Sequence, residues 1–173
     1  ATTNAGGLYS WVYNEQSHAP TLTLKTYTRD GDAVVITFAY SGVTETVGTH
    51  TVTARIASAM WRGSDISANL VFSADIQYEI TPFEVTLVWD FAGEGATEDT
   101  VKNIWYWTYD KASHAPKVTY TDWNGATKTL TVYGGETNAR PAAYTARVDA
   151  PENCVFGANE TGTRSFEIRQ ASI

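Results

Sequence analysis

The stretch SWVYNEQSHAP at residues 10–20 returns, with few changes, as YWTYDKASHAP at residues 106–116. The offset is 106 − 10 = 96 residues, and both copies keep a tryptophan, a tyrosine and the closing Ser-His-Ala-Pro. A repeat on this scale is typical of a chain that uses one building block more than once. The stretch therefore predicts a duplicated unit rather than a single catalytic loop.

The repeated phrase has the chemistry of a turn. Asn14 and Asp110 favour a turn, because a short polar side chain can bond the backbone two residues further on. Pro20 and Pro116 hold the residue before them in an extended conformation. We therefore expect each copy to be a turn that leads the chain back into a sheet.

Three further matches keep the same order along the chain. They are TVTARI (51–56) with AYTARV (143–148), NLVF (69–72) with NCVF (153–156), and YEI (78–80) with FEI (166–168). Their offsets are 92, 84 and 88 residues, which indicates two copies with insertions and deletions in the loops. We place the boundary near Pro82, which gives units 1–82 and 83–173.

The ends of the copies do not match evenly. EVTLVWDF at residues 84–91 predicts a strand that opens the second copy, and its counterpart would fall before residue 1. We expect that the first copy lacks this strand or that the chain is a piece of a longer array. Residues 171–173 follow FEIRQ as though they began a third copy.

Strand patterns dominate both copies. Apolar residues make up 43% of the chain and aromatic residues 13%, and Thr, Val, Tyr and Trp are abundant, which suits a pleated sheet. Alternation predicts strands throughout, including TLTLKTY at residues 21–27, with one face of each opening strand in the core. The expected core residues of these two strands are Tyr9, Trp11 and Tyr13 in the first copy, and Trp105, Trp107 and Tyr109 in the second.

These patterns predict an all-β protein made of two tandem Ig-like β-sandwich modules. A β-grasp-like module is the alternative, because it too uses short strands. It needs a helix across the sheet, which only residues 58–68 could supply, and Gly63 with Ser64 disfavours one. We expect residues 58–68 to form a loop or a short helical turn.

Composition excludes several classes of partner. The formal net charge is −7 and the basic residues are scattered, so we expect neither nucleic-acid binding nor attraction to an anionic membrane. The chain has no apolar run long enough to insert into a membrane. The single cysteine, Cys154, takes the place of Leu70 and is expected to be a small buried hydrophobe.

With these motifs together, the chain resembles the tandem Ig-like repeats of bacterial surface proteins, including the YDG and MBG types. Their pattern W-x-Y-[ND]-G-x-x-H-x-P corresponds to Trp11 through Pro20 and Trp107 through Pro116, and VGTHTVTARI (47–56) resembles their A-G-T-Y-T-V-T-A element. Glu15 and Lys111 stand where that pattern has glycine. The resemblance implies stalk or adhesive modules of an exported protein, without catalytic residues.

The residues that could carry chemistry are few. His18 and His114 recur at one position, but no acids or cysteines converge on them in sequence, so we expect packed or hydrogen-bonded imidazoles. His50 stands where the pattern has tyrosine, as an aromatic substitute. No nucleophile–base set is present, and we predict no enzyme activity, no cofactor and no metal site.

Three aromatic residues are candidates for a ligand surface. Trp123 lies at a strand end beside Asn124-Gly125, aligned with Tyr27, and Trp61 lies in the longer loop of the first copy. A flat, exposed ring can stack on a sugar or anchor a protein partner.

These observations lead to two functional hypotheses. The first is a pair of non-catalytic repeat modules of an exported bacterial surface protein, acting as stalk or scaffold and in adhesion, extracellular and monomeric within a longer chain. The second is a carbohydrate-binding accessory module that contacts a glycan or a host surface protein through Trp123, Trp61 and Tyr27.

Overall fold

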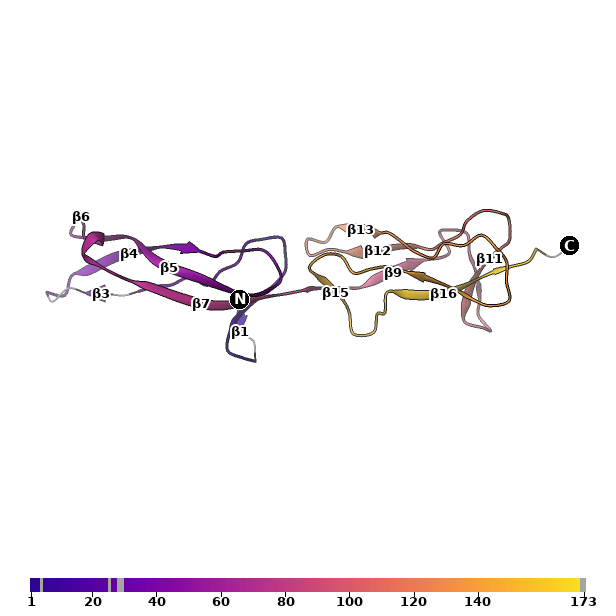
Figure 1. The fold of residues 1–173 in the computed structure, drawn as a ribbon, viewed down its shortest axis with the longest axis horizontal. Helices are drawn as coiled ribbons and strands as arrows, with labels where there is room; N and C mark the ends of the chain where they lie inside the picture. Colours follow the sequence, from indigo (N-terminus) through magenta and orange to yellow (C-terminus); the bar gives the residue numbers. More distant parts are fainter. Residues whose placement is uncertain (4, 25, 28–29, 172–173) are drawn as a thin grey trace. The chain divides into compact units, whose positions relative to one another are not determined.

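The computed structural model describes residues 1–3, 5–24, 26–27 and 30–171, with the backbone alone at 26 and 27. The chain divides into two compact units, Ala1–Pro82 and Phe83–Ile173 (Figure 1). Across the described residues the one helical element is a 3-10 turn, η1 at Ser67–Asn69, so the protein is all-β, as expected, with the packed sheets of a β-sandwich. No helix in this part of the chain has the length and apolarity required to cross a membrane.

The first unit is built on one sheet in which β2 and β7 run parallel and the other neighbours run antiparallel. The order across it is β1-β2-β7-β5-β4-β3, with β6 paired to β5. Its long central strand β5 has 14 residues and pairs with both β7 and β4. The bounds are β1 Thr2–Thr3, β2 Tyr9–Val12, β3 Thr26–Tyr27, β4 Ala33–Ser41, β5 Gly48–Trp61, β6 Ser64–Asp65 and β7 Ser73–Thr81.

The second unit distributes its strands over three sheets, with the orders β10-β11-β16-β14, β13-β12-β9 and β15-β8. An isolated bridge pairs Tyr133, beyond the end of β13, with Arg147 of β14. The bounds are β8 Phe83–Val85, β9 Leu87–Asp90, β10 Thr97–Asp99, β11 Ile104–Thr108, β12 Lys117–Thr121, β13 Thr127–Leu130, β14 Tyr144–Arg147, β15 Cys154–Phe156 and β16 Thr163–Arg169.

The two units share a strand register. In the first, β2 pairs in parallel with β7, and Trp11 lies opposite Ile80. In the second, β11 pairs in parallel with β16, and Trp107 lies opposite Ile168. These positions are related by the offsets of 96 and 88 residues read from the sequence. The duplication is therefore present in the strand pairing as well as in the amino-acid sequence.

One sequence match is wrong in its register. The similarity of residues 51–56 to 143–148 pairs Val52 with Tyr144, but the ladders place His50 opposite Tyr78 and Tyr144 opposite Phe166. His50 therefore corresponds to Tyr144, in agreement with the expected aromatic substitution. A slip of two residues keeps each side chain on the same face of the strand, so the apolar pattern could not reveal it.

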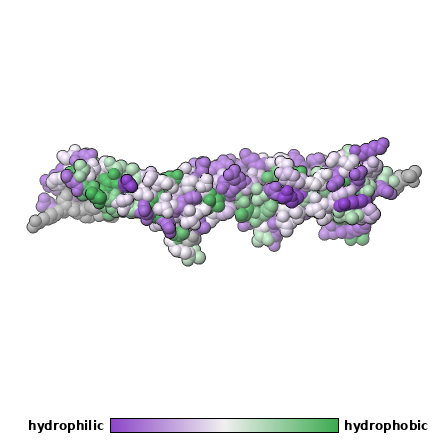
Figure 2. Space-filling model, viewed as in Figure 1, coloured by the Kyte–Doolittle hydropathy of each residue, from purple (hydrophilic) through white to green (hydrophobic). Residues whose placement is uncertain are grey.

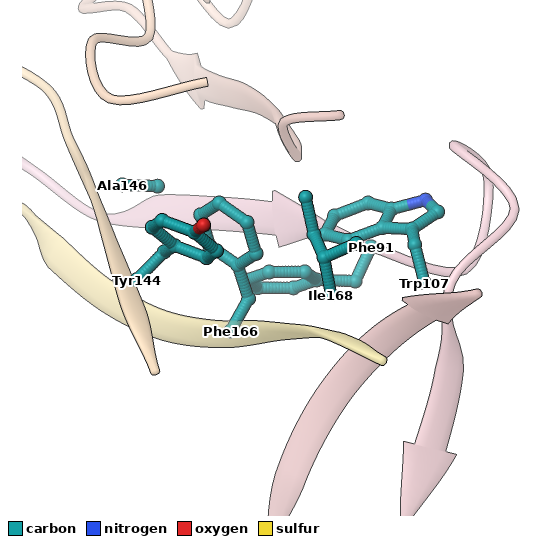
Figure 3. Packing of buried hydrophobic residues seen from close by; sticks show 6 residues of the cluster. All are labelled: Phe91, Trp107, Tyr144, Ala146, Phe166 and Ile168. Atoms are coloured by element: carbon teal, nitrogen blue, oxygen red, sulfur yellow. The ribbon is translucent and has the colours of Figure 1, made fainter. Parts of the chain in front are cut away.

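Aromatic packing forms the main core of the second unit. Figure 3 shows Phe91, Trp107, Tyr144, Ala146, Phe166 and Ile168 gathered from strands distant in sequence. The Trp107 ring meets Phe166 edge-on, with centroids 5.3 Å apart and planes at 89°. A second buried cluster consists of Val85, Leu87, Val118 and Val148. Each of the larger side chains contributes about 1.5–3 kcal/mol by leaving water.

The first unit repeats this packing with fewer buried residues. Its cluster contains Val52, Tyr78 and Ile80. The Trp11 ring meets Tyr78 edge-on at 5.8 Å and 88°, as Trp107 meets Phe166. The expectation that the tyrosines of both opening strands are core residues is wrong for two of them, because Tyr9 is 51% exposed and Tyr109 is 37% exposed.

Two segments differ from expectation. Residues 58–68 form neither a loop alone nor a crossing helix: β5 continues to Trp61, turns back as β6, and only then forms η1. In the segment 21–27, expected to be a strand throughout, the described residues are in a strand only at Thr26–Tyr27. Ser172 and Ile173, expected to begin a third copy, lie outside the described residues.

Candidate functional site

The repeated phrase forms the same local structure in both units, which we name the Trp–His turn (residues 11–18 and 107–114). Asn14 Oδ1 accepts the Gln16 amide N–H at 3.1 Å, and Asp110 Oδ1 accepts the Ala112 amide N–H at 2.8 Å. This is the turn expected from a short polar side chain that bonds the backbone two residues further on.

The imidazole closes each turn. His18 Nε2 donates to Asn14 Oδ1 at 2.7 Å, and His114 Nε2 donates to Asp110 Oδ1 at 2.9 Å. The ring then stacks on the tryptophan of the same turn, with centroids 5.5 Å apart for Trp11 and 5.3 Å for Trp107. The prediction of packed, hydrogen-bonded histidines is confirmed.

Backbone bonds tie each turn to the rest of its unit. His18 N–H donates to Thr44 O at 3.1 Å, while His114 and Glu136 exchange two backbone bonds of 2.8 and 3.0 Å. Immediately after the opening strands, Tyr13 N–H donates to Thr81 O and Tyr109 N–H to Arg169 O. The Trp–His turn therefore connects the opening strand, the closing strand and the loop between them.

The two residues that replace the expected glycine adopt the backbone conformation that glycine favours. Glu15 has φ 57° and Lys111 has φ 71°, both in the left-handed region. This conformation costs a residue with a Cβ about 1–2 kcal/mol. The turn geometry is thus retained in both units although the sequence lacks the residue that best suits it.

The two turns differ in charge. Burial, followed by the positive charge of the chain's amino terminus, lowers the pKa of His18, whose partner Asn14 is neutral. In the second unit the partner is a carboxylate. The bond from the Ala112 amide, followed by the bond from His114, lowers the pKa of Asp110. Protonation of the His18 imidazole is therefore opposed in the first turn. In the second turn the imidazole faces a carboxylate instead of an amide.

The three aromatic ligand candidates lie apart from these turns. Trp61 is the last residue of β5, half-buried, with the Arg62 guanidinium 5.2 Å from its ring centroid. Trp123 lies half-buried in the Asp122–Ala126 turn between β12 and β13. The indole Nε1 of each is buried without a hydrogen-bond partner.

Tyr27 belongs to β3, and its side chain lies outside the described part of the structure. Trp61 and Tyr27 belong to the first unit and Trp123 to the second. Glycan recognition by these residues remains a prediction.

The charged residues of the second unit are occupied with one another. Arg169 donates to Glu167 at 2.7 Å and to Asp99 at 2.8 Å, and its guanidinium lies 3.8 Å from the Tyr106 ring centroid. The Lys102 amide bond and then Arg169 lower the pKa of Asp99. The neighbouring hollow of about 460 Å³ is lined by residues of this network, including Lys102, Glu167 and Arg169. The acids of this network therefore act as ion-pair partners, and the Arg169–Asp99 pair reaches across β11 to join β16 and β10.

Within the described ranges, no group of three or more His, Cys, Asp or Glu side chains could hold a metal ion. The half-buried Cys154 packs against the Val85 cluster, where a hydrophobe was expected.

The chain matches no family model, and no curated protein or solved structure is similar enough to count as a match.

Proposed function

We propose that the two units are non-catalytic repeat modules of an exported bacterial surface protein, where they form part of a stalk that carries tension. The observation that carries the proposal is the parallel pairing of the opening and closing strands in both units. Tyr9–Val12 pairs with Tyr78–Thr81, and Trp105–Thr108 pairs with Phe166–Arg169. The Trp-x-Tyr and His-x-Pro motifs support the surface-protein assignment through their resemblance to such repeats.

Parallel pairing matters because of the direction in which force enters. In the first unit, tension pulls the start of β2 and the end of β7 in opposite directions along neighbouring strands. All hydrogen bonds between the two strands then share the load in shear. An antiparallel pair pulled from a hairpin opens one bond at a time. The bond from Tyr13 N–H to Thr81 O, 2.9 Å long, extends the ladder beyond the last paired residues.

Single-molecule stretching of the whole chain tests the proposal. We expect two separate unfolding events, each lengthening the chain by roughly 25–30 nm at about 3.4 Å per extended residue. Tyr109→Pro removes the N–H that bonds Arg169 O. Its unit should unfold at a clearly lower force, whereas Tyr109→Ala keeps the donor and serves as the control.

The untouched first unit is the internal reference in the same traces. Equal unfolding forces for Tyr109→Pro, Tyr109→Ala and the original chain would overturn the role of the parallel pair. A single unfolding event for the whole chain would overturn the modular design.

A further inference from the structure

The strands β8 and β9 complete the second unit. β9 pairs antiparallel with β12, and β8 pairs in parallel with β15. Their side chains Val85 and Leu87 are 0% and 7% exposed and form the centre of the second buried cluster. A single extended segment thus adds backbone pairing at two edges and fills the space between them.

In the described part of the first unit, nothing corresponds to β8 and β9. The residues that would face them are nevertheless present and apolar. At the offset of 96 residues set by the repeated phrase, Leu22 and Leu24 correspond to Val118 and Tyr120. Val118 is fully buried, whereas its counterpart Leu22 is half-buried. Leu24 is 41% exposed, whereas its counterpart Tyr120 is half-buried.

The second edge is open in the same way. Leu70–Phe72 corresponds to β15, but among the described residues it pairs with no strand. Val71 is 101% exposed, against 43% for its counterpart Val155. A hollow of about 320 Å³ runs along this segment, lined in part by Ile56, Leu70, Val71 and Phe72.

Between the two edges lies a sheet face that is only half-covered. The inward side chains of β4, namely Val34, Ile36, Phe38 and Tyr40, all remain half-exposed. The Phe38 ring contacts Phe72 at 5.4 Å between centroids. Figure 2 shows a hydrophobic area on the first unit in the region that β4 and β5 occupy in Figure 1.

We propose that the first unit is an acceptor for an added β-strand: a separate extended peptide with apolar residues at alternate positions, of the kind seen at Phe83–Phe91. The peptide runs parallel to residues 70–72 and antiparallel to residues 21–24, and its alternate apolar side chains cover the inner face of β4. Main-chain bonds supply affinity in such an addition, and the pockets for alternate side chains supply selectivity. The inference does not depend on the stalk proposal.

The occupant is defined by its counterpart within the same molecule. In the second unit, Val85, Leu87 and Phe91 lie on the inward side of the segment, and Val88, 60% exposed, lies on the outward side. The acceptor should therefore distinguish peptides by their inward positions alone.

The experiment adds a synthetic peptide with the sequence of residues 82–91, PFEVTLVWDF, to the ¹⁵N-labelled whole chain. We expect amide shift changes at Leu22, Leu24 and Val71, and a rise of about 5 °C in the unfolding midpoint of the first unit at saturation. A peptide with Val88→Thr should bind equally well. A peptide carrying Val85→Asp and Leu87→Asp should lose binding at least about tenfold, since each buried carboxylate loses its water.

A variant of the protein provides the reciprocal control. Val71→Pro removes a backbone donor at a fully exposed side chain, so it should abolish peptide binding without lowering the unfolding midpoint of the peptide-free chain.

Three results would overturn the proposal. The first is no shift at millimolar peptide. The second is a set of shifts confined to Cys154–Phe156, which would mean exchange with the second unit's own strand. The third is dimerisation of the chain that the peptide does not dissociate, because the groove would then hold a second copy.

Discussion

Glu15 and Lys111 occupy backbone positions whose left-handed conformation favours glycine. Both follow the turn-forming Asn14 or Asp110, and both have a positive φ. The surrounding contacts enforce the conformation: the imidazole bond closes the turn, and the ring rests on tryptophan. Local strain of this size persists only where neighbouring structure determines it.

Glycine at these positions should stabilise each unit. Glu15→Gly and Lys111→Gly remove a cost of about 1–2 kcal/mol but add disorder to the unfolded chain, so we expect a net gain of about 0.5–1 kcal/mol. Chemical denaturation measures it. Ala112→Gly, at a neighbouring position without positive φ, should destabilise instead. A loss of stability in all three variants would contradict the interpretation.

Burial of His18, whose hydrogen-bond partner Asn14 is neutral, should make the first unit sensitive to acid. The pKa of His18 is lowered in the folded protein, so the stability that comes from the neutral imidazole is complete above its ordinary pKa of 6.5 and decreases as the pH falls below that value. Asn14→Asp offers a carboxylate to the protonated ring and should remove this decrease.

Unfolding midpoints at pH 8 and pH 5, with an NMR titration of His18, test the expectation. His18→Gln serves as the control, because it cannot titrate and should show no decrease from this site. Equal pH dependence in the original chain and in Asn14→Asp would contradict it.

At the scale of the element, two glycines allow the backbone to pass close to the strands β5 and β14. Gly42 and Gly134 both have φ 85°, and a Cβ on either would meet a carbonyl oxygen of the neighbouring strand, Thr51 O or Thr145 O, closer than real Cβ atoms come. The matching glycines also support the register that relates His50 to Tyr144.

Alanine at these glycines should therefore destabilise its unit strongly. For Gly42→Ala and Gly134→Ala we expect at least about 2 kcal/mol more loss than for Gly63→Ala and Gly125→Ala. The control glycines also have positive φ but open space around a Cβ. Denaturant unfolding of the four variants measures the loss in free energy of unfolding. Equal losses would mean that the positive φ alone, and not the close carbonyl oxygen, causes the destabilisation.

The elements also show what could be predicted from the sequence and why the rest could not. Turn residues and alternation are local, so the Trp–His turn and most strand positions were predictable. Register is not local, and the chance likeness of Thr-Ala-Arg at 53–55 and 145–147 moved one match by two residues. Residues 21–24 alternate like a strand but are not in one, because a strand also needs a pairing partner. Alternation within the segment does not show whether that partner is present.

For the candidate ligand residues the sequence was less informative. Exposure of Trp61 and Trp123 depends on how each ring packs against its own unit, and both proved half-buried. The open edge at Leu70–Phe72 carried a signal, since no stretch of residues 1–82 resembles residues 84–91. Only the structure shows that these residues remain uncovered.

At the scale of the whole molecule, the two units differ in the size of their cores. The second buries two apolar clusters, whereas the first, over its described residues, buries one cluster around Val52, Tyr78 and Ile80. Stability scales with the apolar surface removed from water, so duplicated sequence does not mean equal stability.

Heating should unfold the chain in two steps, with the first unit melting earlier. Calorimetry counts the transitions, and hydrogen exchange assigns them, with lower protection expected at Val52 and Tyr78 than at Phe166 and Ile168. A single transition with equal protection in both units would contradict this order.

The pairing of Cys154 with Phe83 has a practical consequence, because this residue is the chain's single cysteine and occupies the first position of the β8–β15 ladder. A thiol-reactive dye can attach at one place only, and the packing of this half-buried thiol against the Val85 cluster should slow the reaction. Faster labelling should therefore report a loosening of the contact between β8 and β15, without an engineered probe.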